Sequence, residues 1–490
     1  MKKRLTIILL IAAMLTSCGG GTTTETTTTA DTTNTQQTET ETTDPRNIPD
    51  DVPELDFGGA AFRSIVQPKV GQDIYAVEET GDTLNDAIYI RTRGVEERLN
   101  VVIAPADEVQ YDMIPNRIKQ CVTAGDDAYE LVLGQMEQTG KDAQSGIFLN
   151  WYDIPYVDFE KPWYPKSVTN GTSSINGRMY NIVSDMLLTF AKCAWVVTFD
   201  KVQAQNYQLG DLYERVYNGE WTLDYIIEIA DSVYTDVNGN GKADDKDFYA
   251  FTANTKDGCL MSAFLYSAGV SFAELQGDSV VMTLNNERAI SVFEKLHTMI
   301  YNTTGVYNTL ATWGGEKSGS VLCDRFTDGT TLFDTMQLDW LATHLREYEN
   351  DYGVLPIPKY DVEQKDYATV TDAGCSVMSV LTTATQLDMI GAVTECLSAE
   401  SYRSVLPTYY DVTLGSKVAR SPEDAEMIDY VLQTRQIDFA YMYDGWGGWV
   451  FKAAEFIQKA DEFASIYAKH EKSVQTYYDE VMEFFHKIEE

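Results

Sequence analysis

Residues 101–134 have the sequence VVIAPADEVQYDMIPNRIKQCVTAGDDAYELVLG, and this stretch decides the fold. Residues 101–105 and 129–134 are short apolar runs of the kind that form buried strands. Between them, residues 114–122 have the apolar spacing of a helix, and Gly125 is placed to end it. Strand, helix and strand in this order predict a parallel βαβ unit.

The same alternation continues on both sides of this stretch. Residues 61–66 (AFRSIV) predict a preceding strand, followed by a helix that begins at Thr83 with a capping-box-like pattern and runs to Leu99. Further strands are expected at residues 194–200, 248–253, 279–284, 330–335 and 352–359. We therefore predict an α/β fold with mostly parallel sheets, whose ligands bind at the carboxyl ends of the strands.

The N-terminal region carries export signals instead of a fold. Residues 1–17 combine the basic KKR at residues 2–4 with an apolar run too short to span a membrane, as in a signal peptide. The sequence LTSC at residues 15–18 resembles a lipobox, so we expect Cys18 to be lipidated. Residues 18–53 are rich in Thr and poor in apolar residues, which predicts a disordered tether. The protein is then expected on the extracellular face of a bacterial membrane, held by its lipid.

Size and charge narrow the possible functions. The remaining chain of roughly 435 residues is too long for one hydrophobic core, so two lobes are expected. The sequence has 75 acidic and 37 basic residues, a net charge of −38, which argues against nucleic acid as a partner. Six cysteines follow Cys18 without any CxxC spacing, and we expect them to be buried thiols; the alternative is that an exported protein pairs some of them.

Residues 236–247, DVNGNGKADDKD, have the spacing of a calcium-binding loop. Calcium takes roughly six to eight oxygen ligands, and Gly241 falls at the position where such a loop turns sharply. The expected ligands are Asp236, Asn238, Asn240, Lys242 through its carbonyl, Asp244 and Asp247. A helical pattern precedes the loop and a strand follows it, so the predicted role of Ca2+ is structural. The alternative is an acidic turn that binds no metal.

The motifs of common enzymes are missing from the sequence. The four histidines are isolated, and there is no HExxH, GxSxG or GxxxxGK[ST]. The two carboxylates of a glycosidase need not be close in sequence, so a hydrolase stays open on these grounds. Nothing in the sequence positively supports an enzyme.

The chain resembles the sugar-type extracellular solute-binding lipoproteins of bacterial ABC importers. The likeness rests on the lipobox, on the Trp-rich start of the terminal helices, and on AWVVTFDK (194–201), NGEWTLDYIIEIA (218–230), FTDGTTLF (326–333) and NDYGVLPIPK (350–359). It implies a two-lobed periplasmic-binding-protein-like fold that holds its ligand in a cleft between the lobes. The chain would cross between lobes near residues 183–194, 371–376 and 437–441. One lobe would contain residues 54–183 and 373–435, and the other residues 184–372 and 436–490.

The resemblance also implies ligand-binding residues, by position and without a strict motif. These are Gln135, Gln138, Asp185, Asp257, Asp444, Trp446 and Trp449. The hexapeptide DGWGGW at residues 444–449 supports this from its own chemistry, because indoles stack on sugar rings and glycines leave a ligand room to approach. Trp313, in a similar TWGG setting, is a further candidate. The alternative is that these tryptophans pack between helices.

The predicted function is therefore a non-catalytic receptor that captures a carbohydrate, expected to be an oligosaccharide, and delivers it to an ABC permease. A surface-anchored carbohydrate hydrolase is the first alternative, and a peptide receptor on the same fold is the second. A hydrolase would hold two carboxylates about 5–5.5 or 6.5–9.5 Å apart in its cleft.

Overall fold

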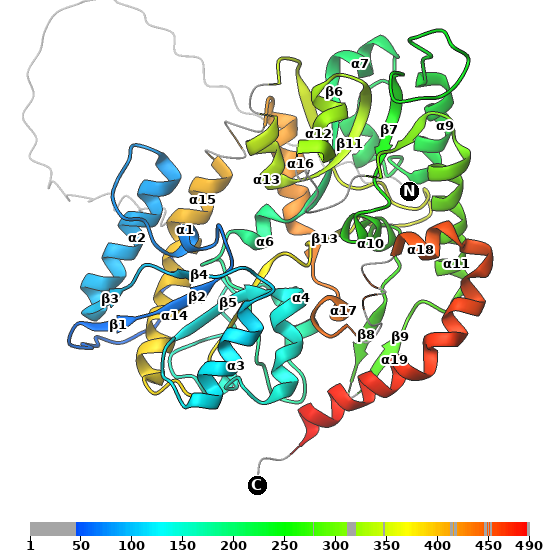
Figure 1. Cartoon of the computed structure of the whole chain (residues 1–490). Helices are drawn as coiled ribbons and strands as arrows, with labels where there is room; N and C mark the ends of the chain where they lie inside the picture. The colour runs from blue at the N-terminus through cyan, green and yellow to red at the C-terminus, as the bar shows by residue number, and fades with distance from the viewer. Residues whose placement is uncertain are drawn as a thin grey trace, which may run out of the picture. The chain divides into compact units, whose positions relative to one another are not determined.

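The computed structural model describes residues 46–487, except 278, 311–319, 346–347, 412–414, 416–418, 445–447, 449 and 451–452. The predicted signal peptide, Cys18 and most of the predicted tether lie outside the described residues, as do Trp313, Trp446 and Trp449. Within the described part the chain has the predicted α/β fold, built on two main sheets (Figure 1).

The first sheet has the strand order β14-β5-β2-β4. β2 (Ser64–Val66) is parallel to β4 (Asp107–Glu108) and to β5 (Leu131–Gln135). β14 (Ser376–Ser379) is antiparallel to β5 and comes from much later in the chain. We call the part of the protein built on this sheet the first lobe; it lies at the lower left of Figure 1.

The predicted strand at residues 61–66 is interrupted. It forms β1 (Ala60–Phe62), which pairs with β3 (Val101–Ile103), and β2, which pairs with β5. Arg63 lies between β1 and β2, and its Nε donates to Glu130 Oε2 (3.0 Å). At this ion pair the apolar run is divided into two strands with different partner strands. β3 and β5 of the predicted βαβ unit are therefore in different sheets.

Helices surround these strands. α2 begins at Thr83 as predicted, but its cap is Asp82, whose carboxylate accepts hydrogen bonds from the amides of Leu84 and Asn85. The helices of the first lobe are α1 (Gly71–Ile74), α2 (Thr83–Leu99), α3 (Ile114–Ala124), α4 (Met136–Thr139), η1 (Gly140–Ser145), η2 (Trp151–Asp153), α5 (Lys166–Val168), η3 (Thr169–Ser173), α14 (Leu387–Glu400), η5 (Ser401–Val405) and α15 (Leu406–Thr408).

The second sheet has the strand order β10-β7-β11-β6-β12 and forms the second lobe. Its first three strands are parallel, and β6 is antiparallel to both of its neighbours. Every residue of β6, β7, β11 and β12 is buried, because helices cover both faces of the sheet, and this explains why the strands are continuous apolar runs in the sequence. The strands are β6 (Trp195–Asp200), β7 (Tyr249–Ala253), β10 (Val306–Asn308), β11 (Thr331–Gln337) and β12 (Tyr352–Leu355).

The elements still to be described are one β-hairpin and the helices outside the first lobe. A hairpin of β8 (Ala273–Gln276) and β9 (Ser279–Met282) lies away from the second sheet, alongside α19 (Figure 1). The helices are α6 (Thr189–Lys192), α7 (Lys201–Asn206), α8 (Leu212–Tyr217), α9 (Leu223–Val233), α10 (Gly258–Ser267), α11 (Glu287–His297), η4 (Thr298–Asn302), α12 (Ser320–Thr327), α13 (Leu338–His344), α16 (Pro422–Gln433), α17 (Phe439–Met442), α18 (Ala453–Gln458), η8 (Ala460–Glu462) and α19 (Phe463–His486).

The segments that cross between the lobes are hydrogen-bonded to one another. β13 (Thr369–Val370) is parallel to β15 (Arg435–Gln436), and Ala194 forms a β-bridge with Thr371. These contacts hold together the backbones of two of the segments that were predicted to cross between the lobes. All six cysteines of the described chain have free thiols, and four of them are buried.

α16 packs on the second lobe, although the predicted division places residues 373–435 in the first. The reason is Asp424, which is fully buried on α16. Its carboxylate accepts from Lys201 Nζ (2.9 Å), from the Tyr213 hydroxyl and from the Val354 amide (3.4 Å), all in the second lobe. Such long-range hydrogen bonds leave no pattern in the local sequence.

Residues 46–53, at the end of the predicted tether, are attached to the first lobe. Asp50 is 6% exposed and forms a two-pronged ion pair with Arg98, with both N–O distances 2.8 Å. Arg403 Nη2 lies 3.5 Å from the same carboxylate. Burial works against the ionised form of Asp50, but Arg98 and Arg403 outweigh it and lower the pKa of Asp50 below its usual value.

We expect Asp50→Asn to lower the free energy of unfolding by about 2 kcal/mol at pH 7, because it removes charge-assisted hydrogen bonds to Arg98. The folded-state pKa lies below the unfolded value of about 3.9, so the stabilisation is present above about pH 4 and is lost as pH falls through the folded pKa. Urea unfolding at pH 7 and pH 3 measures this. Asp51→Asn is the control, since Asp51 is exposed and pairs with Lys161 at the surface; equal effects of the two variants would contradict the prediction.

Candidate functional site

The carboxyl ends of strands from both sheets meet at the second crossing. β5 ends at Gln135, and the next amide, of Met136, donates to the carbonyl of Cys375 (2.8 Å). β7 ends at Ala253, and Asp257 then caps α10 by accepting from the amide of Leu260 (3.0 Å). This is the edge at which ligands bind in parallel α/β sheets.

Asp372 lies at the centre of this region. Its amide donates to the carbonyl of Cys193 on the first crossing (3.0 Å), and its Oδ1 accepts from the amide of Gly374 (2.7 Å). Gln135 reaches the same turn, because a Cβ on Gly374 would be 3.5 Å from Gln135 Nε2. Burial and the nearby charge of Asp257 raise the pKa of Asp372 to about 7, against the effect of the Gly374 amide.

Two more carboxylates extend this acidic region. Glu137 is on α4, directly after β5. Burial raises the pKa of Glu137; the charge of Lys141 acts in the opposite direction, and that of Asp444 adds to the increase. The Asp444 carboxylate accepts a hydrogen bond from the amide of Gly448. Glu137, Asp257, Asp372 and Asp444 therefore form an acidic group between the lobes, which we call the inter-lobe site.

Aromatic and polar groups line the second-lobe side of this region. Trp195 is the first residue of β6, and Trp340 is on α13, just after β11. Their rings are in edge-to-face contact, with centroids 5.4 Å apart. A small cavity of about 10 Å³ beside them, next to Asp257, has room for one water molecule. Asp334 Oδ2 and Thr335 Oγ1 are buried without a hydrogen-bond partner in this neighbourhood. Such groups can accept hydrogen bonds from, and donate them to, a hydroxylated ligand.

The predicted ligand residues are only partly brought together. Gln135, Asp257 and Asp444 are all in or next to the inter-lobe site. Gln138 is half-buried on α4, the same short helix as Glu137. Trp313, Trp446 and Trp449 lie outside the described residues, so their predicted roles stay predictions.

Asp185 belongs to a different group of side chains. Burial raises the pKa of Asp185 to about 7, and the charge of Arg435 opposes this shift. Arg435 Nη2 donates to the Tyr410 hydroxyl (3.4 Å), and its guanidinium lies over the ring of Phe190 (4.5 Å). Asp185 thus faces the charged residue of β15 at the crossing.

Sequence reasoning missed Glu137 and Asp372. Glu137 lies between the two predicted glutamines, so the same strand-end argument covers it. Asp372 is the one charged residue in the run VTDAGCSV at residues 370–377, and a carboxylate in an apolar crossing segment was an available signal.

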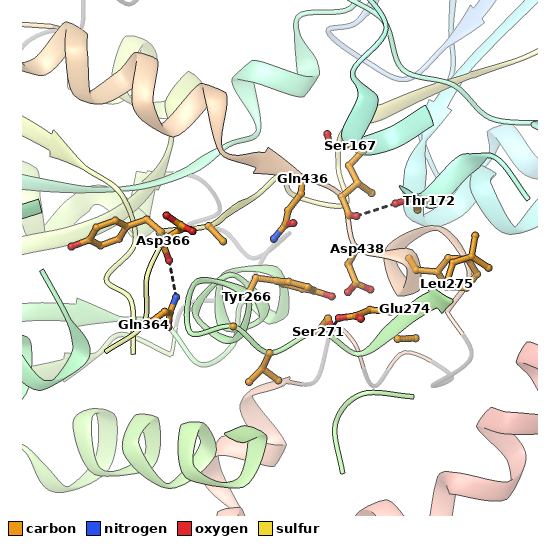
Figure 2. Close-up of a pocket in the computed structure, with 17 residues that line it drawn as sticks. Ser167, Thr172, Tyr266, Ser271, Glu274, Leu275, Gln364, Asp366, Gln436 and Asp438 are labelled. Atoms are coloured by element: carbon orange, nitrogen blue, oxygen red, sulfur yellow. Dashed lines mark hydrogen bonds between the residues drawn. The ribbon is translucent and has the colours of Figure 1, made fainter. Parts of the chain in front are cut away.

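A second, larger cavity of about 630 Å³ lies elsewhere in the protein (Figure 2). Its walls come from Ser167 and Thr172 of the first lobe, from Tyr266 and the turn that leads into β8, from Gln364 and residues 366–368, and from residues 436–439 at the end of β15. None of the predicted ligand residues is among those that line it.

The loop at residues 236–247 is closed by hydrogen bonds among its predicted metal ligands. Asp236 accepts from the amides of Gly239 and Gly241, both at 2.7 Å, and these glycines have the positive φ angles that the turn requires. Asn238 Nδ2 and Asn240 Nδ2 donate to the Asp244 carboxylate at 3.0 and 2.6 Å, and Asp247 is fully buried. Among the residues that the structure describes, no three His, Cys, Asp or Glu side chains are gathered as a metal site, so a cation here would also need the asparagines and the Lys242 carbonyl.

Comparisons with known proteins identify the fold. No family model and no curated protein matches the sequence. A cyclo/maltodextrin-binding protein complexed with maltotetraose matches with a TM-score of 0.56 at 11% identity, over 88% of this chain and 99% of that one. The GacH receptor of Streptomyces glaucescens, solved with acarbose, matches with a TM-score of 0.51 at 10% identity, over 88% of this chain and 100% of that one.

UgpB from Mycobacterium tuberculosis, solved in complex with glycerophosphocholine, matches with a TM-score of 0.53 at 14% identity, over 87% of this chain and 99% of that one. At these identities the likeness establishes the fold, which is the two-lobed fold of periplasmic binding proteins. Within the described residues, no helix is both long enough and apolar enough to cross a membrane.

We expect Asp372→Asn to flatten the dependence of stability on pH. The pKa of Asp372 is about 7 in the folded protein and about 3.9 when unfolded, so the wild type loses stability as pH rises between these values. The variant lacks the ionisable group and keeps an oxygen that can accept from Gly374. Urea unfolding at pH 5 and pH 8 should therefore show a smaller difference for Asp372→Asn than for the wild type. Asp461→Asn, at an exposed site, is the control, and parallel profiles for wild type and Asp372→Asn would disprove the shift.

Proposed function

We propose that this protein is a solute-binding protein that captures a carbohydrate between its two lobes. An oligosaccharide is the favoured ligand. The observation that carries the proposal is the inter-lobe site, where strand ends from both sheets place carboxylates and Gln135 around the second crossing. Carboxylates and amides accept hydrogen bonds from sugar hydroxyls, and neighbouring aromatic rings provide apolar surface for the ring faces. The similar solved proteins include complexes with maltotetraose and acarbose, which supports the same class of ligand here.

We further propose that lipidated Cys18 anchors the protein to the extracellular face of the membrane and that residues 18–53 act as its tether. The sequence LTSC supports the anchor. The proposed partner that receives the sugar is an ABC permease, which the resemblance to the receptors of ABC importers supports. The net charge of −38 leaves nucleic acid as an unsuitable partner.

A carbohydrate hydrolase is the second candidate, and one observation favours it. Asp372 has a pKa of about 7 beside the carboxylate of Asp257. A carboxylic acid that stays protonated near neutral pH, next to an ionised one, is the arrangement of a glycosidase. The similar solved proteins are binding proteins, which favours the receptor. A peptide ligand is the third possibility, since acidic and aromatic walls also suit basic peptides.

We also propose that residues 236–247 bind calcium in a structural role. The side chains of Asp236, Asn238, Asn240, Asp244 and Asp247 and the Lys242 carbonyl would hold it. The loop joins α9 to β7, and Arg325 on α12 donates to the carbonyls of Asp245 and Asp247 at 3.0 and 2.8 Å. A cation that fixes this loop would therefore stabilise the packing of three elements of the second lobe.

The receptor proposal predicts that maltooligosaccharides raise the melting temperature, compact the protein in small-angle scattering, and are recovered intact after long incubation. A free sugar concentration of one hundred times the Kd should raise the free energy of unfolding by about 2.7 kcal/mol. Trp446→Ala and Trp449→Ala should each weaken binding by roughly tenfold to a hundredfold, because stacking and burial are lost.

Trp221→Ala is the matched control, since Trp221 is fully buried and its Nε1 donates to the carbonyl of Pro356 (2.8 Å). It should cost about 3–5 kcal/mol of folding energy and change the affinity of the folded fraction little. Release of shortened sugar would show a hydrolase. Early melting with normal affinity in Trp446→Ala or Trp449→Ala would place that tryptophan in the core.

For the calcium proposal, removal of metal with EDTA should lower the melting temperature, and calcium should restore it. Asp236→Ala should melt at the lower temperature with or without EDTA, because its loop cannot hold the cation. Asp245→Ala, within the same loop but at none of the ligand positions, should keep the response to calcium. A wild-type protein whose melting temperature is the same in demetallated buffer and in calcium would refute the proposal.

A further inference from the structure

The large cavity shown in Figure 2 lies apart from the inter-lobe site. It adjoins the C-terminal end of α10 through Tyr266, whereas the inter-lobe site includes Asp257 at the N-terminal cap of the same helix. A helix of ten residues is about 15 Å long. The volume of about 630 Å³ is in the range of small-molecule sites. A ligand in this cavity would therefore be separate from one in the inter-lobe site.

The cavity is strongly acidic. Glu274, Asp366 and Asp438 line it, and none of the described residues that line it is Lys, Arg or His. Arg288 touches the lining by donating to Gln364 Oε1 (2.8 Å), but its guanidinium lies over the ring of Tyr360 (3.9 Å). Asp366 is paired at the surface with Lys365, whose Nζ lies 3.6 Å from its carboxylate, and Lys359 Nζ lies over the ring of Tyr367 (5.3 Å). Among the described residues, neither Asp438 nor Glu274 forms an ion pair, so these two carboxyl groups are the source of negative charge in the cavity.

Asp438 is the most deeply placed of these carboxylates. It is 4% exposed, and its carboxylate accepts from the amide of Ala440. Burial raises the pKa of Asp438 to about 8, although backbone amides, that of Ala440 first among them, act to lower it. A positive charge in the cavity would favour the ionised form of this group.

The hydroxyl of Tyr266 is an independent observation that points to a ligand. The residue is 5% exposed, and its hydroxyl is buried without a hydrogen-bond partner. Figure 2 shows its side chain extending into the cavity toward Asp438 and Glu274. A buried hydroxyl that makes no hydrogen bond is costly, so a ligand that supplies one would bind favourably here. Tyr367 and Phe439 add aromatic surface to the same walls.

We propose that this cavity is a second binding site, which takes a small organic cation with a protonated amine. An ammonium group supplies a positive charge next to Asp438 and Glu274, and its N–H groups can donate to the Tyr266 oxygen. Aromatic rings favour cations over their faces. A metal ion fits less well, because among the described residues no three His, Cys, Asp or Glu side chains are gathered as a metal site.

The test compares two probes of the same shape, benzylamine and benzyl alcohol, by isothermal titration calorimetry of the purified protein at pH 7. Benzylamine is protonated and should bind with one-to-one stoichiometry, at least tenfold more tightly than the neutral alcohol. Its affinity should fall as salt is raised. Equal affinities of the two probes, or no binding of benzylamine, would overturn the proposal.

Variants locate the site. Asp438→Asn keeps an oxygen for the Ala440 amide and should weaken benzylamine binding at least tenfold. Tyr266→Phe removes only the hydroxyl and should weaken it severalfold, so it decides the outcome if Asp438→Asn fails to fold. Glu363→Gln removes one exposed charge outside the cavity and should have no effect. Loss of benzylamine binding in Asp257→Asn, with none in Asp438→Asn or Tyr266→Phe, would assign the amine to the inter-lobe site and reject the second site.

Discussion

The hydrogen bonds between crossing segments are the interaction on which the rest of the structure depends. Ala194 pairs with Thr371, and β13 pairs with β15, so backbone from three distant parts of the chain runs together between the lobes. The inter-lobe site is built directly on this arrangement, because the amide of Asp372 donates to the carbonyl of Cys193. The same segments that connect the lobes therefore also position a central carboxylate of the site. A change in the angle between the lobes would move Asp372 relative to Gln135 and Asp257.

Buried carboxyl groups are common to the inter-lobe site and the large cavity, but their setting differs. In the inter-lobe site, burial and the charge of Asp257 raise the pKa of Asp372, and the amide of Gly374 offsets part of this increase. In the large cavity, burial alone accounts for the raised pKa of Asp438. A ligand's hydroxyl groups can donate hydrogen bonds to the carboxyl groups of the inter-lobe site without adding charge. The large cavity instead favours a ligand that carries a positive charge. The two sites are thus suited to different chemistries within one acidic protein.

The sequence predicts the fold well where local pattern and burial agree. β6 and β7 are buried on both faces, so their apolar runs at residues 194–200 and 248–253 were readable as strands. The strand-end rule placed Gln135 and Asp257 at or just after the ends of β5 and β7, and their role as ligand residues stays a prediction. The local pattern failed at Arg63, where Glu130 splits one apolar run into β1 and β2, and at α16, which Asp424 attaches to the second lobe. Both features depend on partners far away in sequence, and a local pattern contains no information about them.

The pairing of β14 with β5 has a consequence for the time course of folding. Ser376 and Gln135 are neighbours in the first sheet but about 240 residues apart in the chain, and β12 joins β6 across about 160 residues. Neither sheet can be completed until about three quarters of the polypeptide has been made. Contacts so distant in sequence slow folding, because a long loop must close before they form. Slow folding is what the predicted signal peptide would require, because an exported chain must stay unfolded until it has crossed the membrane.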